Sequence, residues 1–267
     1  MQVYSHSYSV ILDNMDLKEY RLRPIAAIMY LQDAFARFTA TKNMAAYDLF
    51  PKNIYWVVGE FNIDFVNLMP FWSEEIKIEV WFSELSKTKI YIDFNIYCNN
   101  ILFSKGNACW FLLNLENKRL VKTDEIKENI EIYSQYVLGE HKKFILPEKK
   151  EKFSEISHII NISDLDFNNH VNNKSYINIA ETAMNKEYKN AHTIKSMKIK
   201  FIKESFLNDK LICSTYKTDF PDIFVHEIEK DGNSICEIIT IWTNTKNSGD
   251  ILNADLKVKK EDYAAAF

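Results

Sequence analysis

The stretch PIAAIMYLQDAFARFTATKN, residues 24–43, decides how the first half of the chain folds. Apolar residues recur in it at steps of three and four, the spacing of one buried helical face: Ile28, Leu31, Phe35 and Phe38. Pro24 suits the first turn of a helix, where its missing N–H would have no partner within the helix. The sequence therefore predicts a long helix that begins at Pro24 and buries one side.

The residues after this helix change to the period of β-strands. Apolar and polar residues alternate in four segments bounded by polar turns. These segments are IYWVVGEFNIDFV (54–66), EEIKIEVWFSEL (74–85), TKIYIDFNIY (88–97) and NACWFLLNLE (107–116). The first half is thus predicted to be one helix followed by an antiparallel meander.

The second half repeats this order. A short helical pattern over residues 171–184 is followed by strand patterns over residues 194–202, 210–218, 222–230 and 234–244. FVNLMPFWSEEIKI from Phe65 also matches FIKESFLNDKLIC from Phe201 in its apolar pattern. We interpret this as an internal duplication of an α+β unit, with a chance likeness of two alternating segments as the alternative. The expected boundaries are residues 1–135 and 154–267, joined by a charged connector over 136–153.

Composition excludes several functional classes. The formal charge of −4 favours no nucleic-acid partner, and the four cysteines lack the spacing of a zinc site. The five glycines form no phosphate-binding loop, so we expect no cofactor and no metal. The sequence has no signal-like start and no run of 18 apolar residues. These features predict a cytoplasmic protein without a membrane partner.

The segment DLDFNNHVNNKSYI, residues 164–177, concentrates carboxylate, amide and imidazole groups just before the second helix. Free backbone N–H groups at a helix start can stabilise negative charge, such as the oxyanion formed when an ester or thioester is attacked. The alternative is that the Asn and Asp residues only cap the helix.

This segment closely resembles the signature of plant and bacterial acyl-acyl-carrier-protein (acyl-ACP) thioesterases, including its Asp, Asn and His, the VNN that follows and Tyr176. The resemblance covers nearly the whole chain. It implies an α+β, tandem (double) hotdog fold, in which each unit is a long helix wrapped by an antiparallel sheet. It also implies hydrolysis of a fatty acyl thioester carried on the phosphopantetheine of ACP.

The resemblance also assigns residue roles. It places catalysis on the motif residues Asp166, Asn168 and His170, together with Glu204 in the second unit. Plant members usually carry Cys directly after that Glu, whereas this chain has Ser205, so we expect Asp166 to attack directly or to activate water. The expected oxyanion and secondary positions are Val171, Asn172 and Ser205.

Large apolar residues of the first unit are expected to line an acyl-chain pocket, with plain core packing as the alternative for each. They are Met29, Phe35, Phe61, Phe65, Trp72 and Trp81. Lysines of the connector and of KSMKIKFIK, residues 195–203, could steer an acidic carrier protein, with solvated surface charge as the alternative.

Other functions remain open at this point. An acyl-CoA thioesterase of the same fold and a non-catalytic acyl-binding hotdog protein are the alternatives, and a hotdog dehydratase fits the motif less well. The sequence also leaves open whether the protein forms a homodimer.

Overall fold

A computed structural model of the chain describes residues 2–16, 20–166 and 169–244. Within these residues, ten strands form one antiparallel sheet in the order β1-β3-β4-β5-β2-β7-β10-β9-β8-β6. The strands of the first half are β1 (Tyr4–Ser9), β2 (Ile54–Phe65), β3 (Glu75–Leu85), β4 (Ile90–Cys98) and β5 (Ile101–Asn114). Those of the second half are β6 (Lys152–Ile159), β7 (His192–Phe201), β8 (Lys210–Lys217), β9 (Ile223–Lys230) and β10 (Asn233–Asn244).

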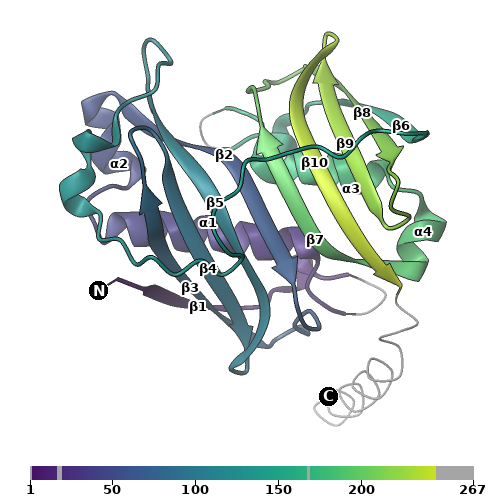
Figure 1. Cartoon of the computed structure of the whole chain (residues 1–267), viewed down its shortest axis with the longest axis horizontal. Helices are drawn as coiled ribbons and strands as arrows, with labels where there is room; N and C mark the ends of the chain where they lie inside the picture. Colours follow the sequence, from purple (N-terminus) through teal and green to yellow (C-terminus); the bar gives the residue numbers. More distant parts are fainter. Residues whose placement is uncertain (1, 17–19, 167–168, 245–267) are drawn as a thin grey trace.

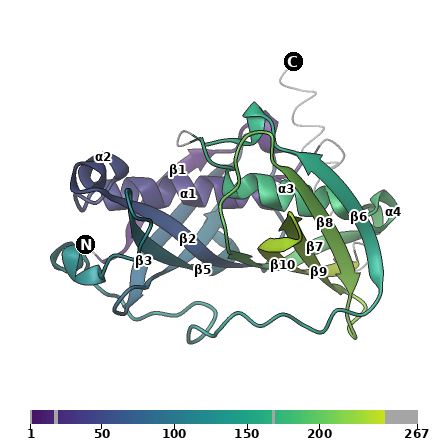
Figure 2. The same cartoon turned by 90° about the horizontal axis from the view of Figure 1, so that it is seen from above.

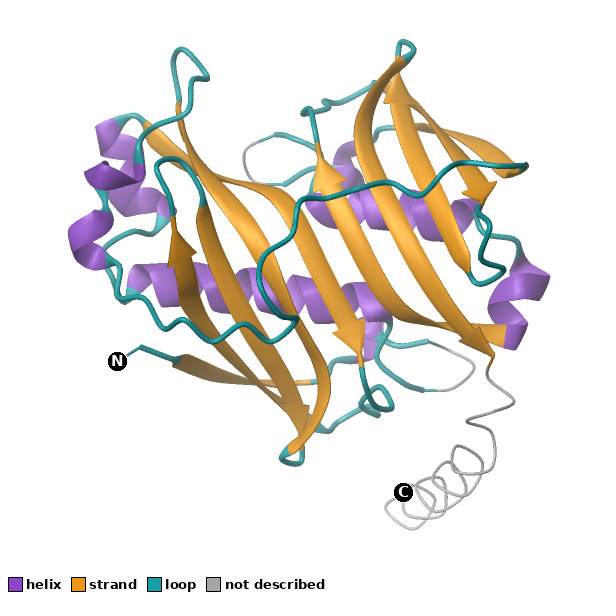
Figure 3. Ribbon diagram, in the orientation of Figure 1, coloured by secondary structure: helices purple, strands orange, loops and turns teal. Residues whose placement is uncertain are grey.

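The α-helices are α1 (Pro24–Ala40), α2 (Ala46–Leu49), α3 (Asn173–Ala183) and α4 (Lys186–Ala191). Helices α1 and α3 lie on one face of the sheet, and α2 and α4 lie towards its two ends, as Figure 1 and Figure 3 show. Short 3-10 helices cover Leu12–Asn14, Phe50–Lys52, Thr123–Glu125, Lys127–Asn129 and Ile162–Asp164. The long helix predicted from Pro24 and the strands predicted after it are confirmed.

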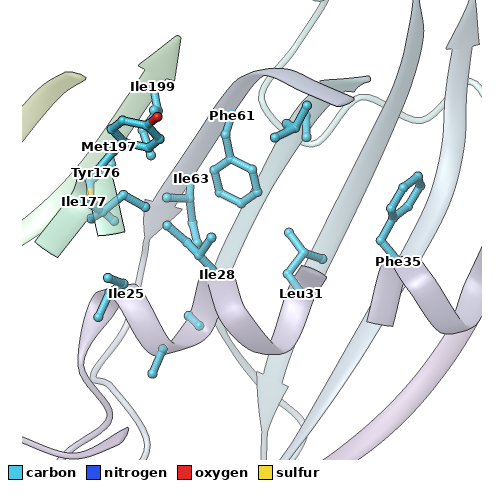
Figure 4. Packing of buried hydrophobic residues seen from close by; sticks show 14 of the residues in the cluster. Ile25, Ile28, Leu31, Phe35, Phe61, Ile63, Tyr176, Ile177, Met197 and Ile199 are labelled. Atoms are coloured by element: carbon cyan, nitrogen blue, oxygen red, sulfur yellow. The ribbon is translucent and has the colours of Figure 1, made fainter. Parts of the chain in front are cut away.

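Helix α1 buries the predicted apolar stripe. Ile28, Leu31 and Phe35 are all buried and face β2, where Figure 4 shows Phe61 and Ile63 packed above them. The same cluster continues into α3 and β7, so one hydrophobic core runs under both halves. Burial of such side chains contributes about 1.5–3 kcal/mol each, which fixes the helix against the sheet.

Strands β2 and β7 join the two halves into one sheet. They pair antiparallel over residues 60–64 of β2 and 196–200 of β7. The two halves also share local detail: the Val10 N–H donates to the Glu74 carbonyl at 2.9 Å, and the Ile160 N–H donates to the Asp209 carbonyl at 2.9 Å. The matching order of elements and the matching hydrogen bonds support the predicted duplication.

The segment between β5 and β6 crosses the sheet on the face opposite the helices, as Figure 2 shows. A buried polar cluster holds it there. The Val137 N–H donates to Asp93 Oδ1 at 2.8 Å, and His141 Nε2 lies 3.4 Å from Asp93 Oδ2. His141 also stacks on the ring of Tyr91, with ring centroids 4.2 Å apart. These contacts fix the path of the connector.

Replacing Asp93 by Ala is expected to lower the free energy of unfolding by about 3 kcal/mol, because it leaves the Val137 N–H without its acceptor and the His141 imidazole with Ser83 alone. Denaturant unfolding of the variant and of the parent protein measures this difference. The exposed Asp124→Ala is the control and should change stability by less than about 0.5 kcal/mol. Equal midpoints for the Asp93 variant and the parent would show that the cluster does not anchor the connector.

Candidate active site

A cavity of about 660 Å³ opens where β2 and β7 separate. The two strands pair only as far as Glu60 of β2 and Lys200 of β7. Beyond this point the first part of β2 and the chain that follows β7 diverge, and residues from both line the cavity. The site is therefore formed between the two halves of the chain.

The two sides of this cavity differ in chemistry. The first half supplies an apolar wall from β2 and β5: Trp56, Val57, Val58, Trp110, Phe111 and Leu113. The second half supplies most of the polar groups: Asp166, His170, Asn172, Asn173 and Glu204. It also supplies apolar residues such as Phe201 and Ile202, and the first half adds the polar ends of Tyr55 and Lys118. Such a combination, mostly apolar with a few polar groups at one end, is typical of a binding site for an amphipathic small molecule.

Asp166 and His170 belong to one tight turn before α3. The Asp166 N–H donates to the His170 carbonyl at 2.8 Å, and the His170 N–H donates to Asp166 Oδ1 at 3.3 Å. Asn172 is the N-cap of α3, and its side chain accepts a hydrogen bond from the Lys174 N–H at 3.0 Å. The motif thus lies at the start of a helix, as the sequence predicts.

Glu204 reaches the same site from the segment after β7. Its Oε1 lies 3.6 Å from His170 Nδ1. The His170 ring packs edge-on against Phe206, with ring centroids 5.3 Å apart. The structure therefore brings together three of the four predicted catalytic residues, Asp166, His170 and Glu204. Asn168 lies outside the described residues.

The expected oxyanion donors need a correction. The Val171 N–H donates to the Ser205 carbonyl at 3.0 Å, and the Asn172 N–H donates to the Asp164 carbonyl at 2.8 Å. Both amides are therefore already used by the backbone that builds the turn. An oxyanion would need a different donor. Asn172 and Asn173 both line the cavity.

The first half has Asp16 at the place of Asp166 but no carboxylate at the place of Glu204. The hydrogen bond from the Val171 N–H to the Ser205 carbonyl has a counterpart in the first half. There the Leu22 N–H donates to the Pro70 carbonyl at 2.8 Å. Pro70 thus occupies the place of Ser205, and Met69 occupies that of Glu204. The sequence comparison that starts from Phe65 and Phe201 pairs Met69 with Ser205 instead, so the structural match is shifted from it by one residue.

Ser205 is fully buried, and its hydroxyl is not among the groups that line the cavity. Its Oγ lies near the Tyr176 side chain but forms no hydrogen bond of good geometry. A buried hydroxyl in this position cannot reach a substrate in the cavity. Its backbone carbonyl, which holds Val171, is the part of Ser205 that shapes the site.

Ser205→Ala is therefore expected to change the hydrolysis rate less than about threefold and to leave stability unchanged or slightly higher, because it removes an unsatisfied polar group. Steady-state kinetics and thermal unfolding of the variant measure both. A complete loss of hydrolysis with the fold retained would instead assign Ser205 as a nucleophile.

The six large apolar residues predicted to line an acyl pocket lie elsewhere in the structure. Within the described residues, none of the six lines this cavity. Phe35, Phe61, Phe65 and Trp81 are buried, whereas Met29 and Trp72 are half-buried. Phe35 lies directly behind the wall, because it stacks on Trp110 at 4.2 Å between ring centroids.

Other nucleophile-bearing clusters do not fit catalysis. Ser83 Oγ and the Asp93 carboxylate both approach Nε2 of His141, whereas a nucleophile–His–acid triad uses both ring nitrogens. Burial raises the pKa of the Cys109 thiol to about 11 and that of the Cys213 thiol to about 12. These thiols therefore stay protonated and unreactive at neutral pH.

The fold and the site together define a double-hotdog protein with a carboxylate–imidazole centre at one end of a partly apolar cavity. Residues 1–133 match the acyl-ACP thioesterase N-terminal domain, and residues 147–244 match the acyl-ACP thioesterase C-terminal domain. The chain belongs to the acyl-ACP thioesterase family.

Individual relatives agree with this placement. The palmitoyl-acyl carrier protein thioesterase of Arabidopsis thaliana is 29% identical over 138 residues, which are 49% of this chain and 33% of that protein. The chain therefore matches about a third of the length of this relative. An acyl-ACP thioesterase from Bacteroides thetaiotaomicron superposes with a TM-score of 0.79 at 17% identity, covering 90% of this chain and 98% of that one.

A plant structure shows the same fold. The 12:0-ACP thioesterase from Umbellularia californica superposes with a TM-score of 0.79 at 16% identity, covering 91% of this chain and 97% of that chain. The predicted α+β, tandem hotdog fold is confirmed. Among the described residues, no helix is both long enough and apolar enough to cross a membrane.

Proposed function

We propose that this protein hydrolyses fatty acyl-ACP thioesters to a free fatty acid and holo-ACP. The observation that carries the proposal is the division of one cavity into an apolar wall and a cluster of Asp166, His170 and Glu204. A fatty acyl thioester has the same two parts, an alkyl chain and a polar reacting carbon. The family to which the chain belongs acts on this class of substrate.

In the proposed mechanism Asp166 attacks the thioester carbon directly or takes a proton from an attacking water. A C–O bond forms, the C–S bond breaks, and the phosphopantetheine sulfur leaves as a thiol after it receives a proton. If Asp166 itself attacks, the new C–O bond belongs to an acyl–Asp anhydride, and water then cleaves this anhydride to release the fatty acid and restore the Asp166 carboxylate. His170, with Glu204 beside it, orients the reacting groups and carries the proton. The resemblance adds Asn168 as a further orienting group. We propose Asn173, at the start of α3, as the oxyanion donor in place of Val171 and Asn172.

We propose a separate role for each of the two units. The unit of residues 1–135 would bind the acyl chain along its apolar wall, the connector of residues 136–153 would link the units, and the unit of residues 154–267 would supply the catalytic groups. This assignment moves the acyl chain from the residues predicted by the sequence to Trp56, Val57 and their neighbours in β2 and β5.

We propose ACP as the carrier and a cytoplasmic location. Several connector lysines that were expected to steer ACP are already paired with acids: Lys149 with Glu227, Lys150 with Glu148, and Lys152 with Glu155. Lys118 and Lys203 line the cavity itself and are better placed to meet an acidic carrier.

Hydrolysis of a panel of acyl-ACPs of different chain length, with the matching acyl-CoAs in parallel, tests the proposal. We expect free fatty acid and holo-ACP as products, with higher kcat/KM on the ACP series. Higher kcat/KM on the CoA series would identify an acyl-CoA thioesterase. Stable binding of acyl chains without release of thiol would show a non-catalytic acyl-binding protein and overturn the proposal.

A further inference from the structure

A chain of polar contacts connects the first half of the protein to the catalytic groups of the second. Lys118 Nζ donates to the Tyr55 hydroxyl at 3.3 Å, and the Tyr55 hydroxyl donates to Glu204 Oε1 at 3.5 Å. The same oxygen, Glu204 Oε1, is the one that lies 3.6 Å from His170 Nδ1. One carboxylate oxygen therefore faces a tyrosine from the first half and the imidazole of the second.

The surrounding structure fixes Tyr55 and Lys118 in these positions. Tyr55 is buried near the start of β2 and is opposite Leu113 of β5. Lys118 lies in the turn after β5, where its N–H donates to the Asn114 carbonyl at 3.0 Å. Its Nζ also lies 4.9 Å from the centroid of the Tyr55 ring, a cation–π distance. Both side chains line the cavity.

The chemistry of these groups sets the direction of the hydrogen bonds. Burial raises the pKa of Tyr55, and the nearby Glu204 adds to this effect, while Lys118 opposes it. The hydroxyl therefore keeps its proton at neutral pH and donates it to the carboxylate. The Lys118 ammonium can only donate, so it occupies the oxygen of Tyr55 and leaves the hydroxyl hydrogen for Glu204.

Glu204 needs such a partner to be held in one orientation. Its side chain is 35% exposed and follows the end of β7, where the regular sheet has ended. A partly exposed glutamate loses rotamer freedom when it is fixed, and the hydrogen bond from Tyr55 together with the nearby His170 imidazole can offset that cost.

We infer that Tyr55, held by Lys118, is a positioning residue that orients the Glu204 carboxylate toward His170. The catalytic centre is then complete only where the two halves of the chain meet. The inference rests on the proposed function for its effect on catalysis, and on the geometry of the site alone for its effect on His170.

The kinetic test is Tyr55→Phe, which keeps the ring and removes the hydroxyl. We expect kcat on acyl-ACP to fall about tenfold, the size expected for the loss of one hydrogen bond to a charged group, with KM changed by less than about twofold. Tyr47→Phe is the matched control, because Tyr47 is an exposed tyrosine on α2, and it should leave both constants unchanged. An unchanged kcat in Tyr55→Phe would overturn the inference.

Lys118 provides an independent second test. Lys118→Met should lower kcat several-fold, and Lys118→Arg should restore part of the loss, because Arg also donates to the Tyr55 oxygen. Lys122→Met removes an exposed lysine nearby and should have no effect. Equal rates for the Met and Arg variants at position 118 would show that Lys118 does not act through Tyr55.

The imidazole NMR signals of His170 decide the inference without using activity. They are assigned by their loss in His170→Gln. In Tyr55→Phe their chemical shifts should change, because the carboxylate is no longer held beside the imidazole. Unchanged chemical shifts overturn the inference, even in an active enzyme. Changed chemical shifts in a protein that hydrolyses no acyl thioester would support the inference and reject the proposed function.

Discussion

Asp166→Asn is expected to lower kcat on acyl-ACP by about a thousandfold or more, with the fold unchanged. An amide can neither attack the thioester carbon nor take a proton from water, and each of these roles contributes about 10²–10⁴ in rate. The substitution is mild for the structure, because the Asn Oδ1 can still accept the hydrogen bond that Asp166 Oδ1 receives from the His170 N–H. Steady-state kinetics, together with thermal unfolding, measures both effects.

The control for this experiment is Asp13→Asn, which removes an exposed carboxylate in the 3-10 helix that precedes α1. It is expected to leave kcat unchanged. Near-native hydrolysis by a correctly folded Asp166→Asn protein would remove Asp166 from the mechanism and leave His170 and Glu204 as the remaining polar groups that meet at the reacting end of the cavity.

The parts of the fold that the sequence predicts are those in which a local period decides the structure. The apolar stripe of α1 repeats every three to four residues, and its burial against β2 is the consequence of that pattern. The position of Asp166 before α3 is predicted for a similar reason, since Asn172 is an N-cap residue just before the helical pattern. The resemblance supplies the distant partner Glu204, which no local pattern indicates.

The edge strands β1 and β6 are not predicted, because little of their pattern is apolar. In β1 the sequence YSHSYS alternates in exposure, but its less exposed face carries Tyr4, His6 and Tyr8 and no aliphatic residue. An edge strand needs fewer buried residues than a central one, so its amphipathic signal is weak. Pairing with β3 determines its structure instead.

The contacts inside the site depend on tertiary structure and could not be predicted. Tyr55 and Glu204 are 149 residues apart, and their meeting depends on where β2 and β7 separate. The use of the Val171 amide by the Ser205 carbonyl depends on the return of the chain after β7. The residues predicted to line the acyl pocket do not line the cavity. The chain has 18 phenylalanines, and the sequence alone does not show which of its many apolar residues face the cavity.

Val57→Trp is expected to shorten the acyl chain that the enzyme accepts. Val57 is half-buried, lines the cavity and is opposite Phe111 in the neighbouring strand. A larger ring there should exclude several methylene groups of a long substrate, and each buried methylene contributes about 0.8 kcal/mol. Loss of four such contacts, about 3 kcal/mol, should lower kcat/KM on hexadecanoyl-ACP about a hundredfold while octanoyl-ACP is hydrolysed normally.

Two further variants show whether the effect belongs to this cavity. Val66→Trp places the same ring just after β2, at an exposed position that does not line the cavity, and should leave the chain-length profile unchanged. Met29→Trp changes a residue of α1 that the sequence assigned to the acyl pocket and that lies away from the cavity lining. A shift to shorter chains in Met29→Trp, with none in Val57→Trp, would place the acyl chain against α1 instead of the wall formed by β2 and β5.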